Sequence, residues 1–588
     1  EAGSYFERAA RVFERANSPW LAYCLSSLGG ISEAKKEYDK AFALHREALD
    51  VAEKHGDRRL IVQCLLGLAD AHLSAEKYEE ALPILEEGVE AAEQLGHFEM
   101  QLRARWATAN CLSWLERPAE ALEQVQPTID IINRTYQGLG GEEGAQARAQ
   151  YARVFNLGSS AAGKLNDAPK TFFYLETGRA GGLLEALGGR AQLRSAAIPE
   201  GLREEEALVR KAMDTARARH QEAVQVKDLK QARSRKKELD VAQEKMRDVI
   251  QKIQRDAKAS AGLLYPSPVA LAELQGTLAK DEALVSYAVF SRKAMALVIT
   301  AGTARVVQLG EREAIVDACD ALVLDDTEED PSGRIEQLRE LLIKPLALEA
   351  GVKRILISPD GPLSYIPFSM LVGTRAVAYV PSGTTLALLR GERHERGKKV
   401  LALGDPVYTG ELERLPETRT EAKAVGDVVL LGEDATKAGL ETALAKRKRW
   451  RAVHLACHGL IDRERPTLSS LAITGGNLTA FDVMRMNFAA DLVVLSACET
   501  GKGKIVRGEG LIGLTRAFML AGTPRVIVSL WPVEDKATQA LMKKFFQLWK
   551  RGAPAASALM KAQAHVRSKK KWKHPSYWAA WQLWGLPE

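Results

Sequence analysis

The sequence is poor in cysteine, in aromatic residues and in long apolar runs. Its 588 residues include only six cysteines, and 6% of all residues are aromatic. The cysteines are scattered without a Cys-x-x-Cys pair, which argues against a disulfide framework and against a zinc site. We therefore expect no metal and no cofactor. Scattered free thiols are typical of a reducing compartment, so we expect a cytoplasmic protein.

Other absences narrow the class of protein further. No run reaches 18 apolar residues, so we expect no transmembrane helix. The first residues are charged and amphipathic, unlike a secretory signal peptide. A net charge of +6 is small for this length and does not by itself indicate nucleic-acid binding. With 46% hydrophobic and 27% charged residues, the composition is that of an ordinary globular protein of two to four domains.

The first part of the chain contains a repeat. The segment Glu37–Ala41 recurs as Lys77–Ala81 and again as Arg117–Ala121, with the final alanines 40 residues apart. A fixed period of this length is typical of stacked helix hairpins, with small residues where paired helices approach closely. We therefore predict an all-α, tetratricopeptide-like helical-repeat region over residues 1–195, with a degenerate fourth unit at about 144–187. Such arrays usually bind a partner protein, although a purely structural support is the alternative.

The next segment is dense in charge. Residues 202–260 contain almost no aromatic side chains, and Val209 and Met213 keep helical spacing. This pattern predicts two long, solvent-facing helices that form an antiparallel hairpin over residues 196–265. Because both signs of charge are mixed, a solvated surface is favoured over an RNA-binding arm.

Beyond Pro268 the pattern changes to alternating strands and helices, which predicts a mostly parallel sheet covered on both faces. The expected strands are Ala283–Phe290, Ala294–Thr300, Arg354–Ser358, Lys399–Leu403, Ala452–Cys457, Leu492–Ala497 and Val526–Leu530, and the expected helices include Glu411–Val429 and Gly510–Ala521. In such sheets chemistry gathers at the carboxyl ends of the strands. The residues that follow each strand are therefore the ones to inspect.

Two of these strands end in a reactive side chain. The first is followed by His458 and Gly459, and the second by Cys498. If the two strands are neighbours in one parallel sheet, the imidazole and the thiol emerge at the same edge, where the histidine can activate the thiol. We predict that His458 and Cys498 are a catalytic pair. The backbone N–H groups of Gly459 and Cys498 are the candidates for an oxyanion hole.

Each of these residue types also has an ordinary structural role. A cysteine at a strand end is often a small buried hydrophobe, and a lone histidine is often a satisfied core residue. Strand alternation places His454 and His458 on one face and Cys457 on the other. We expect Cys457 to be structural.

Four segments resemble the CHAT family, which comprises caspase-like peptidases attached to tetratricopeptide repeats and related to caspases, gingipains and separase. They are HLACHG, LSACETG, SPDGPLSYIPFSML and GEGLIGLTRAFMLAGTPRVIVSLWPVED. The resemblance implies a multidomain chain whose α/β half is caspase-like, with His458 and Cys498 as the dyad. It also implies a degenerate, silent caspase-like half at 266–397 and a catalytic half at 398–588.

The resemblance also suggests which residues choose the substrate. Asp535, with Glu534 beside it, resembles the acid that lines the pocket for the residue before the cut in separase. Asp405 lies where related peptidases place a pocket-lining charge. An acid there would favour arginine or lysine in the substrate. The alternative is that Glu534 and Asp535 simply begin a helix, where carboxylates suit the helix dipole.

The implied function is a cysteine endopeptidase that cleaves a partner protein after a basic residue. In bacteria such enzymes resemble regulated defence or cell-death effectors, with a gasdermin-type or similar substrate and with an activator bound to the repeats. One alternative is a non-catalytic scaffold with a vestigial peptidase domain. Another is a protease associated with an RNA-guided complex, for which the basic clusters Lys446–Arg449, Lys398–Lys399 and Lys569–Lys571 are the only sequence support.

Overall fold

The computed structural model of the protein describes most of the chain. The described residues are 2–136, 142–186, 200–225, 229–256, 268–322, 324, 329–392, 395–408, 412–460, 469–496 and 510–588. The chain forms two compact units, one of residues 1–137 with 151–174 and the other of residues 138–150 with 175–588. Two of the divisions fall inside helices α8 (Glu142–Lys164) and α9 (Ala168–Ala186), before the boundary expected at residue 195.

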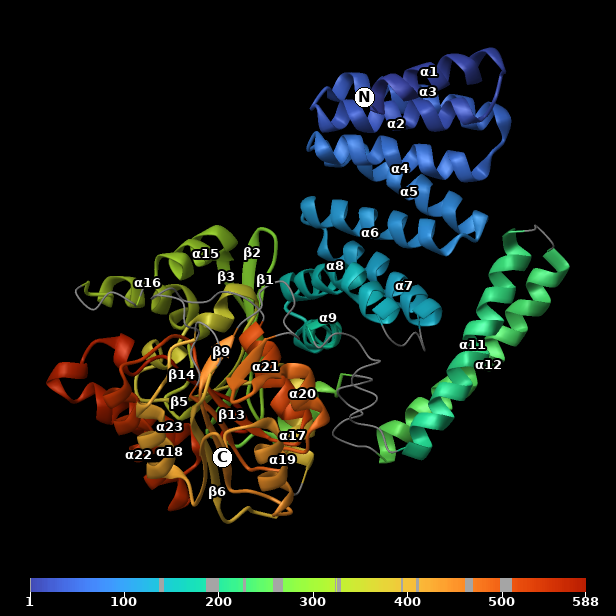
Figure 1. Ribbon diagram of the computed structural model, residues 1–588. Coiled ribbons are helices and arrows are strands. Elements are labelled where there is room, and N and C mark those ends of the chain that lie inside the picture. Colours follow the sequence, from blue (N-terminus) through green and yellow to red (C-terminus); the bar gives the residue numbers. More distant parts are fainter. Residues whose placement is uncertain are drawn as a thin grey trace. The chain divides into compact units, whose positions relative to one another are not determined.

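The first unit is all-α, as the repeat predicts. Its helices are α1 (Ala2–Arg15), α2 (Trp20–Ala34), α3 (Tyr38–His55), α4 (Arg58–Ser74), α5 (Tyr78–Leu95), α6 (Phe98–Trp114), α7 (Pro118–Tyr136) and α8 (Glu142–Lys164), which form successive hairpins (Figure 1). Helices α3, α5 and α7 begin 40 residues apart, and Ala41, Ala81 and Ala121 on them are fully buried. The alanines therefore lie where the absence of a larger side chain lets neighbouring helices pack closely.

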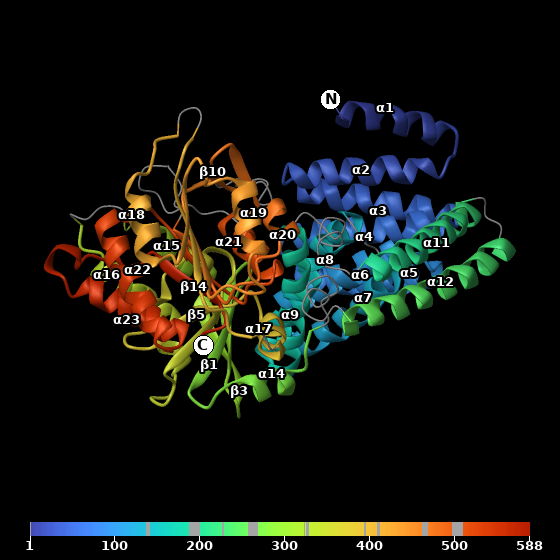
Figure 2. The ribbon, with the colours of Figure 1, turned by 60° about the horizontal axis from the view of Figure 1, so that its bottom comes forward.

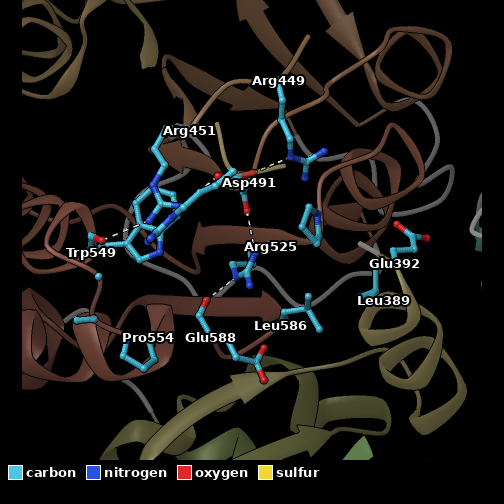
Figure 3. A pocket seen from close by; sticks show the side chains of 14 residues that line it. Leu389, Glu392, Arg449, Arg451, Asp491, Arg525, Trp549, Pro554, Leu586 and Glu588 are labelled. Atoms are coloured by element: carbon cyan, nitrogen blue, oxygen red, sulfur yellow. Dashed lines mark hydrogen bonds and ion pairs between the residues drawn. The ribbon is translucent and has the colours of Figure 1, made fainter. Parts of the chain in front are cut away.

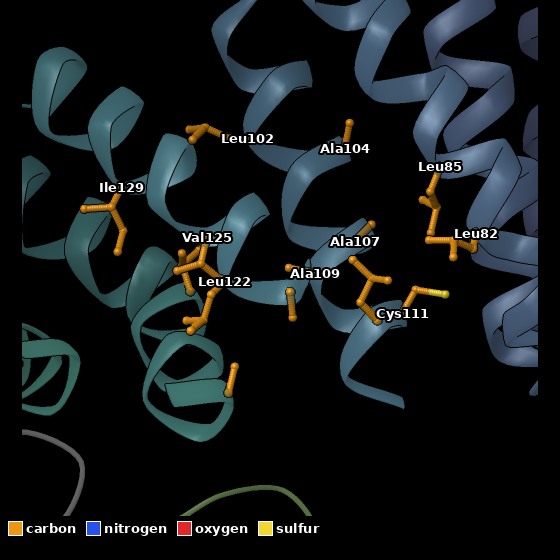
Figure 4. Packing of buried hydrophobic residues seen from close by; sticks show 14 of the residues in the cluster. Leu82, Leu85, Leu102, Ala104, Ala107, Ala109, Cys111, Leu122, Val125 and Ile129 are labelled. Atoms are coloured by element: carbon orange, nitrogen blue, oxygen red, sulfur yellow. The ribbon is translucent and has the colours of Figure 1, made fainter. Parts of the chain in front are cut away.

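The helices of this unit share an apolar core built largely from alanine and leucine. Figure 4 shows Leu82 and Leu85 of α5, Ala104 and Ala107 of α6, and Leu122 of α7 among its members. Small residues on α6 leave room for the larger side chains of α5 and α7. This alternation of small and large side chains is what close packing of a helix stack requires.

One buried histidine lies in a gap made by two glycines. A Cβ atom at Gly29 would lie 2.6 Å from the His45 ring, and one at Gly67 would lie 2.7 Å from it. Both positions therefore need glycine as long as the ring is there. Burial lowers the pKa of His45 to about 4, so this histidine is neutral at physiological pH.

The charged segment that follows forms two long helices, α11 (Glu200–Gln225) and α12 (Leu229–Asp256). They lie side by side in both views (Figure 1, Figure 2). Met213, Leu239 and Met246 are buried between them, while most other described side chains are exposed. A narrow apolar seam of this kind is sufficient to pair two helices that are otherwise solvated.

The second unit is built on one sheet of eleven strands. These are β1 (Glu282–Val289), β2 (Lys293–Ile299), β3 (Ala304–Glu311), β4 (Arg354–Ser358), β5 (Ala376–Tyr379), β6 (Val400–Pro406), β7 (Val428–Gly432), β8 (Ala452–Ala456), β12 (Val493–Ser496), β13 (Arg525–Ser529) and β14 (Trp581–Gly585). Their order is β3-β2-β1-β4-β5-β14-β13-β12-β8-β6-β7. Only β1–β2, β2–β3 and β13–β14 are antiparallel pairs, so the predicted mostly parallel sheet is confirmed. The strands of residues 266–397 lie on one side of the order and those of 398–588 on the other.

Helices cover both faces of this sheet. The views agree that α18 (Glu417–Val425), α22 (Asp535–Lys550) and α23 (Ala555–Arg567) lie on one side, with α17 (Gly383–Gly391), α19 (Lys437–Ala445) and α20 (Ala480–Arg485) on the other (Figure 1, Figure 2). The other described α-helices after residue 268 are α14 (Leu271–Thr277), α15 (Arg312–Ala321), α16 (Ser332–Leu342) and α21 (Gly510–Leu520). None of the described helices is long and apolar enough to cross a bilayer.

The helix expected over Glu411–Val429 is wrong at both ends, because α18 begins only at Glu417 and ends before strand β7. Helix α18 stops at Val425, and Val428–Gly432 forms strand β7 beside β6. Gly426 marks the change, because its own backbone passes so close to β6 that an added Cβ would lie 2.7 Å from the Cβ of Ala402. The β-branched pair Val428 and Val429 then favours an edge strand over another helical turn.

Candidate active site

The two strands that end near the predicted catalytic pair are neighbours. Strand β8 pairs with β12 in parallel, and Ala456 lies opposite Ser496 in the register. His458 follows Ala456 by two residues, and Cys498 follows Ser496 by two residues. Adjacent strands lie about 4.8 Å apart, so β8 and β12 end side by side at this edge of the sheet. Cys498 itself lies outside the described residues.

His458 does not continue β8. The chain leaves the main sheet at Cys457, and His458 begins a separate short strand, β9 (His458–Leu460). That strand pairs with β10 (Ser470–Ile473), which in turn pairs with β11 (Gly476–Thr479), and Gly459 lies opposite Leu471. The prediction that His454 and His458 share a strand face is therefore wrong, because alternation holds only within one continuous strand.

The His458 side chain is almost completely buried and already has a hydrogen-bond partner. Its Nε2 atom lies 2.6 Å from the main-chain oxygen of Glu413. A carbonyl oxygen only accepts, so Nε2 is the donor in this arrangement. The hydroxyl of Tyr408 accepts from the His458 backbone N–H at 3.3 Å, and the two rings lie 5.0 Å apart between centroids.

His454 of β8 and Cys457, which follows that strand, are both enclosed by the protein. His454 is fully buried, and its Nε2 atom lies 2.9 Å from a carboxylate oxygen of Glu421 on α18. Cys457 is also buried, and burial raises the pKa of its thiol to about 12. A thiol with that pKa is not a nucleophile at neutral pH.

Asp405 lies at the end of β6 and is bound by two arginines of its own chain. Its carboxylate accepts from Arg414 at 2.8 and 3.1 Å and from Arg419 at 2.7 Å. Burial acts to raise the pKa of Asp405, but the hydrogen bonds from Arg414 and Arg419 outweigh it and hold that pKa below its usual value. The backbone of Asp405 has a φ of +50°, which is unusual for a residue other than glycine. The pairing of β6 with β7 is interrupted at the same position.

One short segment touches both predicted functional side chains. The backbone carbonyl of Glu413 accepts the hydrogen bond from the His458 ring, and the guanidinium of the next residue, Arg414, donates to the Asp405 carboxylate. Residues 412–416, which we call the 412–416 segment, therefore cover the carboxyl edge of β6 and β8. The His458 imidazole and the Asp405 carboxylate, which are predicted to act on a substrate, are therefore both hydrogen-bonded within the protein.

Two parts of the chain match known domain families. Residues 333–586 match the CHAT domain family, and residues 25–94 match the tetratricopeptide repeat family. The chain carries a CHAT domain behind N-terminal tetratricopeptide repeats. It is 25% identical to tetratricopeptide repeat protein 28 of Mus musculus over 328 residues, which cover 43% of this chain and 13% of that protein. It is 40% identical to the Homo sapiens protein of the same name over 108 residues, which cover 18% of this chain and 4% of that protein. The chain thus spans only a small part of these relatives.

Two solved structures are also similar to this chain. The separase chain of the Saccharomyces cerevisiae separase–securin complex aligns with a TM-score of 0.36 and 9% identity, over 99% of this chain and 64% of that chain. BtubC from P. vanneervenii aligns with a TM-score of 0.27 and 16% identity, over 45% of this chain and 91% of that one.

The other acids predicted to line a substrate pocket begin a helix of the CHAT domain. Asp535 is the first residue of α22, and Glu534 immediately precedes it. The Glu534 carboxylate accepts from the Trp572 indole at 2.9 Å. Partial burial raises the pKa of Asp535, and the carboxylates of Glu417, Glu421 and Glu534 raise it further. Their place at the helix start fits the structural alternative, and their role in a pocket stays a prediction.

The sequence did not point to the partners of His458 and Asp405 in this CHAT domain. Arg414 and Arg419 lie in the stretch ERLPETR after β6, which is expected to be helical throughout and carries no signal for contacts with Asp405. A backbone carbonyl such as that of Glu413 carries no sequence signature at all. Within the described part of the chain, no group of three or more His, Cys, Asp or Glu side chains is arranged to hold a metal ion.

Proposed function

We propose that this chain is a cysteine endopeptidase with Cys498 as nucleophile and His458 as its base. The observation that carries the proposal is the register of β8 and β12. Because Ala456 and Ser496 are paired, β8 and β12 end side by side, and His458 and Cys498 each follow the end of one of these strands by two positions in the sequence. A CHAT domain, whose family the resemblance links to caspase-like peptidases, agrees with this assignment.

The chemistry is acyl transfer to a thiol. His458 takes the proton of Cys498, and the thiolate attacks the scissile carbonyl carbon. The N–H groups of Gly459 and Cys498 are proposed to stabilise the oxyanion. As the C–N bond breaks, His458 returns the proton to the leaving amine, and a water molecule then hydrolyses the acyl-enzyme. The thiol and the neutral imidazole are regenerated.

The substrate preference that we propose is a basic residue before the cut, with Asp405 as its partner. Asp405 already binds the fork of the Arg414 guanidinium through both of its oxygens. This internal contact supports the idea that the site has the charge and the planar geometry for an arginine side chain. A substrate arginine would then have to displace Arg414.

We further propose that the 412–416 segment holds the enzyme at rest. The proton on His458 Nε2 is committed to the Glu413 carbonyl, and Asp405 is occupied by Arg414. An activating partner, bound by the tetratricopeptide repeats, would release the segment. A resting state of this kind is what a regulated bacterial defence or cell-death effector needs, because an unrestrained protease would harm its own cell.

The test is cleavage of peptides by wild type and by Cys498→Ala. A pooled library of peptides with each residue at the cut site is incubated with the full chain, and new amino termini are identified by mass spectrometry. We expect cuts after arginine and lysine from wild type and a loss of several orders of magnitude in Cys498→Ala. Cys457→Ala is the matched control and should retain activity.

One observation favours a second candidate, the non-catalytic scaffold. Both His458 and Asp405 have partners within the chain, as they would in a vestigial site that no longer meets substrate. A thiol-directed peptidyl inhibitor that ends in arginine separates the two. A scaffold would leave Cys498 unlabelled even when residues 412–416 are altered, whereas a peptidase would be labelled at Cys498.

A further inference from the structure

A cavity lined with arginines lies at the other edge of the main sheet (Figure 3). Its volume is about 360 Å³. Arg451 lies just before β8, Arg525 begins β13, and Asp491 lies shortly before β12. These are the amino ends of strands whose carboxyl ends lead to the candidate active site. At about 3.3 Å per residue, the seven residues from Arg451 to His458 place the cavity roughly 20 Å from the imidazole.

Two of the arginines are fixed by one aspartate. The Asp491 carboxylate accepts from Arg449 at 2.6 Å, from Arg451 at 3.0 Å and from the backbone N–H of Gly397 at 2.9 Å. The Arg451 guanidinium also lies 3.7 Å from the centre of the Trp549 ring. Arg449 belongs to the basic cluster Lys446–Arg449, which is considered above as a possible nucleic-acid contact, and its side chain is hydrogen-bonded to Asp491.

Among the described residues, the other two arginines have no ion pair with an aspartate or glutamate side chain, although the carboxylates of Glu588 and Asp491 lie near enough to Arg525 to act on it. Arg525 donates to main-chain oxygens only, to Glu588 at 2.6 Å and to Asp491 at 3.3 Å. Burial lowers the pKa of Arg525 and outweighs the carboxylates of Glu588 and Asp491, which act to raise it, while the guanidinium groups of Arg451 and Arg449 add to the lowering. Arg396 also lines the cavity, is exposed, and has no acceptor within hydrogen-bonding distance among the described residues.

The acids around the cavity do not balance this charge. Besides Asp491, the acidic lining residues are Glu392 and Glu588, against four arginines. The Glu588 carboxylate is engaged by Arg390 at 2.8 Å, and Arg390 does not line the cavity. The lining therefore carries four guanidinium groups against three side-chain carboxylates, and among the described residues Arg396 and Arg525 are the two that no side-chain ion pair engages.

We propose that this cavity binds a small phosphate-bearing molecule through Arg396 and Arg525. Guanidinium groups bind phosphate oxygens through two parallel hydrogen bonds, and two of them match the double negative charge of a phosphate monoester. A volume of about 360 Å³ holds a phosphate group and part of an organic moiety. Leu389, Pro524 and Leu586 supply apolar wall for that moiety. The site is separate from the candidate active site and does not depend on the peptidase proposal.

The test is calorimetric titration of the full chain with inorganic phosphate, AMP and succinate. We expect one binding site for the phosphate compounds and much weaker binding of the dicarboxylate. Arg396→Gln should weaken phosphate binding by about 10- to 100-fold, because it removes a charge-assisted contact. Arg551→Gln is the matched control, since Arg551 is a nearby exposed arginine that does not line the cavity.

Each outcome decides something. AMP binding more tightly than phosphate assigns the site to an organic phosphate, and equal binding assigns it to the inorganic ion. Succinate binding as well as phosphate would overturn the proposal, and so would the absence of any binding at millimolar concentration. Equal weakening by Arg551→Gln would reduce the effect to general surface charge and also reject the site. Arg525→Lys provides a second variant that keeps the charge but loses the fork, and it should weaken binding about tenfold.

Discussion

The two edges of the main sheet each hold an aspartate bound by two arginines, but the two clusters differ in burial. At the carboxyl edge the Asp405 side chain is 2% exposed, while those of Arg414 and Arg419 are 59% and 40% exposed. At the amino edge the Asp491 side chain is 9% exposed, and those of Arg449 and Arg451 are only 12% and 10% exposed. The same residue types therefore form an open cluster at one edge and a closed cluster at the other.

The difference in burial implies that the arginines of the two clusters differ in how easily they can leave their aspartate. An arginine that reaches an aspartate from solvent can leave at little cost, because water replaces its contacts. An arginine enclosed against Trp549 and main-chain oxygens cannot leave without stranding a charge. The open cluster is thus suited to binding and release, and the closed one to holding three strand ends together.

The largest expected effect is on stability, from Asp491→Asn. The substitution leaves Arg449 and Arg451 buried without a counter-charge, so we expect a loss of about 3–5 kcal/mol in the free energy of unfolding. Urea denaturation followed by tryptophan fluorescence measures it. Asp405→Asn is the matched variant, and it should cost clearly less because its arginines can turn to solvent. Equal losses from the two variants would remove the distinction between the clusters.

The comparison between the two clusters can be extended to a buried ionisable group that has no charged partner. His45 in the repeat unit is such a group. Its folded-state pKa of about 4 lies below the ordinary value of about 6.5, so the unfolded chain binds a proton more readily between these values. The stability from keeping His45 neutral is present above about pH 6.5 and is lost as the pH falls toward 4.

We expect this loss to reach about 2 kcal/mol at pH 5. It is measured as the difference in the pH dependence of thermal unfolding between wild type and His45→Gln. His55→Gln, on the same helix, is the control and should leave the wild-type pH dependence intact. If His45→Gln loses stability with falling pH as steeply as wild type, the pH dependence does not come from His45.

The sequence predicted the parts of this architecture that follow from periodicity. The 40-residue recurrence of Ala41, Ala81 and Ala121 predicted the helix stack, and the apolar runs predicted seven strands to within a few residues. The prediction of the catalytic pair assumed that the strands before His458 and Cys498 are parallel neighbours, and β8 and β12 are paired in this way. Patterns of this kind are local, and they repeat often enough in the chain to be read without coordinates.

The sequence could not predict the contacts that cover the candidate site. The break after Ala456, which moves His458 into a second sheet, depends on pairing with β10 farther along the chain. The carbonyl of Glu413 has no sequence signature, and Arg414 resembles any other loop arginine. The Asp491 cluster joins residues about 40 positions apart, whose meeting only the sheet order determines.

The open cluster predicts an activating substitution, provided that the peptidase proposal holds. Arg414→Ala removes the guanidinium from Asp405 and loosens the Glu413 carbonyl on His458, so thiolate formation at Cys498 should rise about fivefold. The rate of iodoacetamide labelling at Cys498 measures it, since the other five cysteines are buried. Arg419→Ala also takes one guanidinium from Asp405 but leaves the 412–416 segment bound, and it should have a smaller effect.

These outcomes separate the two ideas that the experiment combines. Labelling that is slow in every variant, and that Cys498→Ala does not reduce, would reject the peptidase. Labelling at Cys498 that Arg414→Ala leaves unchanged would reject only the resting role of the segment.

The smallest expected effect is that of salt, which should act on the open cluster alone. At 1 M salt the Debye length is about 3 Å, so the exposed pair of Arg414 and Asp405 is screened. We expect labelling of wild-type Cys498 to rise about twofold between 0.05 and 1 M salt, while Arg414→Ala stays flat. Because the ion pairs of the Asp491 cluster are largely buried and so little screened by salt, the stability difference between wild type and Asp491→Asn should persist at 1 M salt. A difference that disappears in salt would mean that the amino-edge cluster is as open as the other, and the contrast in burial would have no energetic meaning.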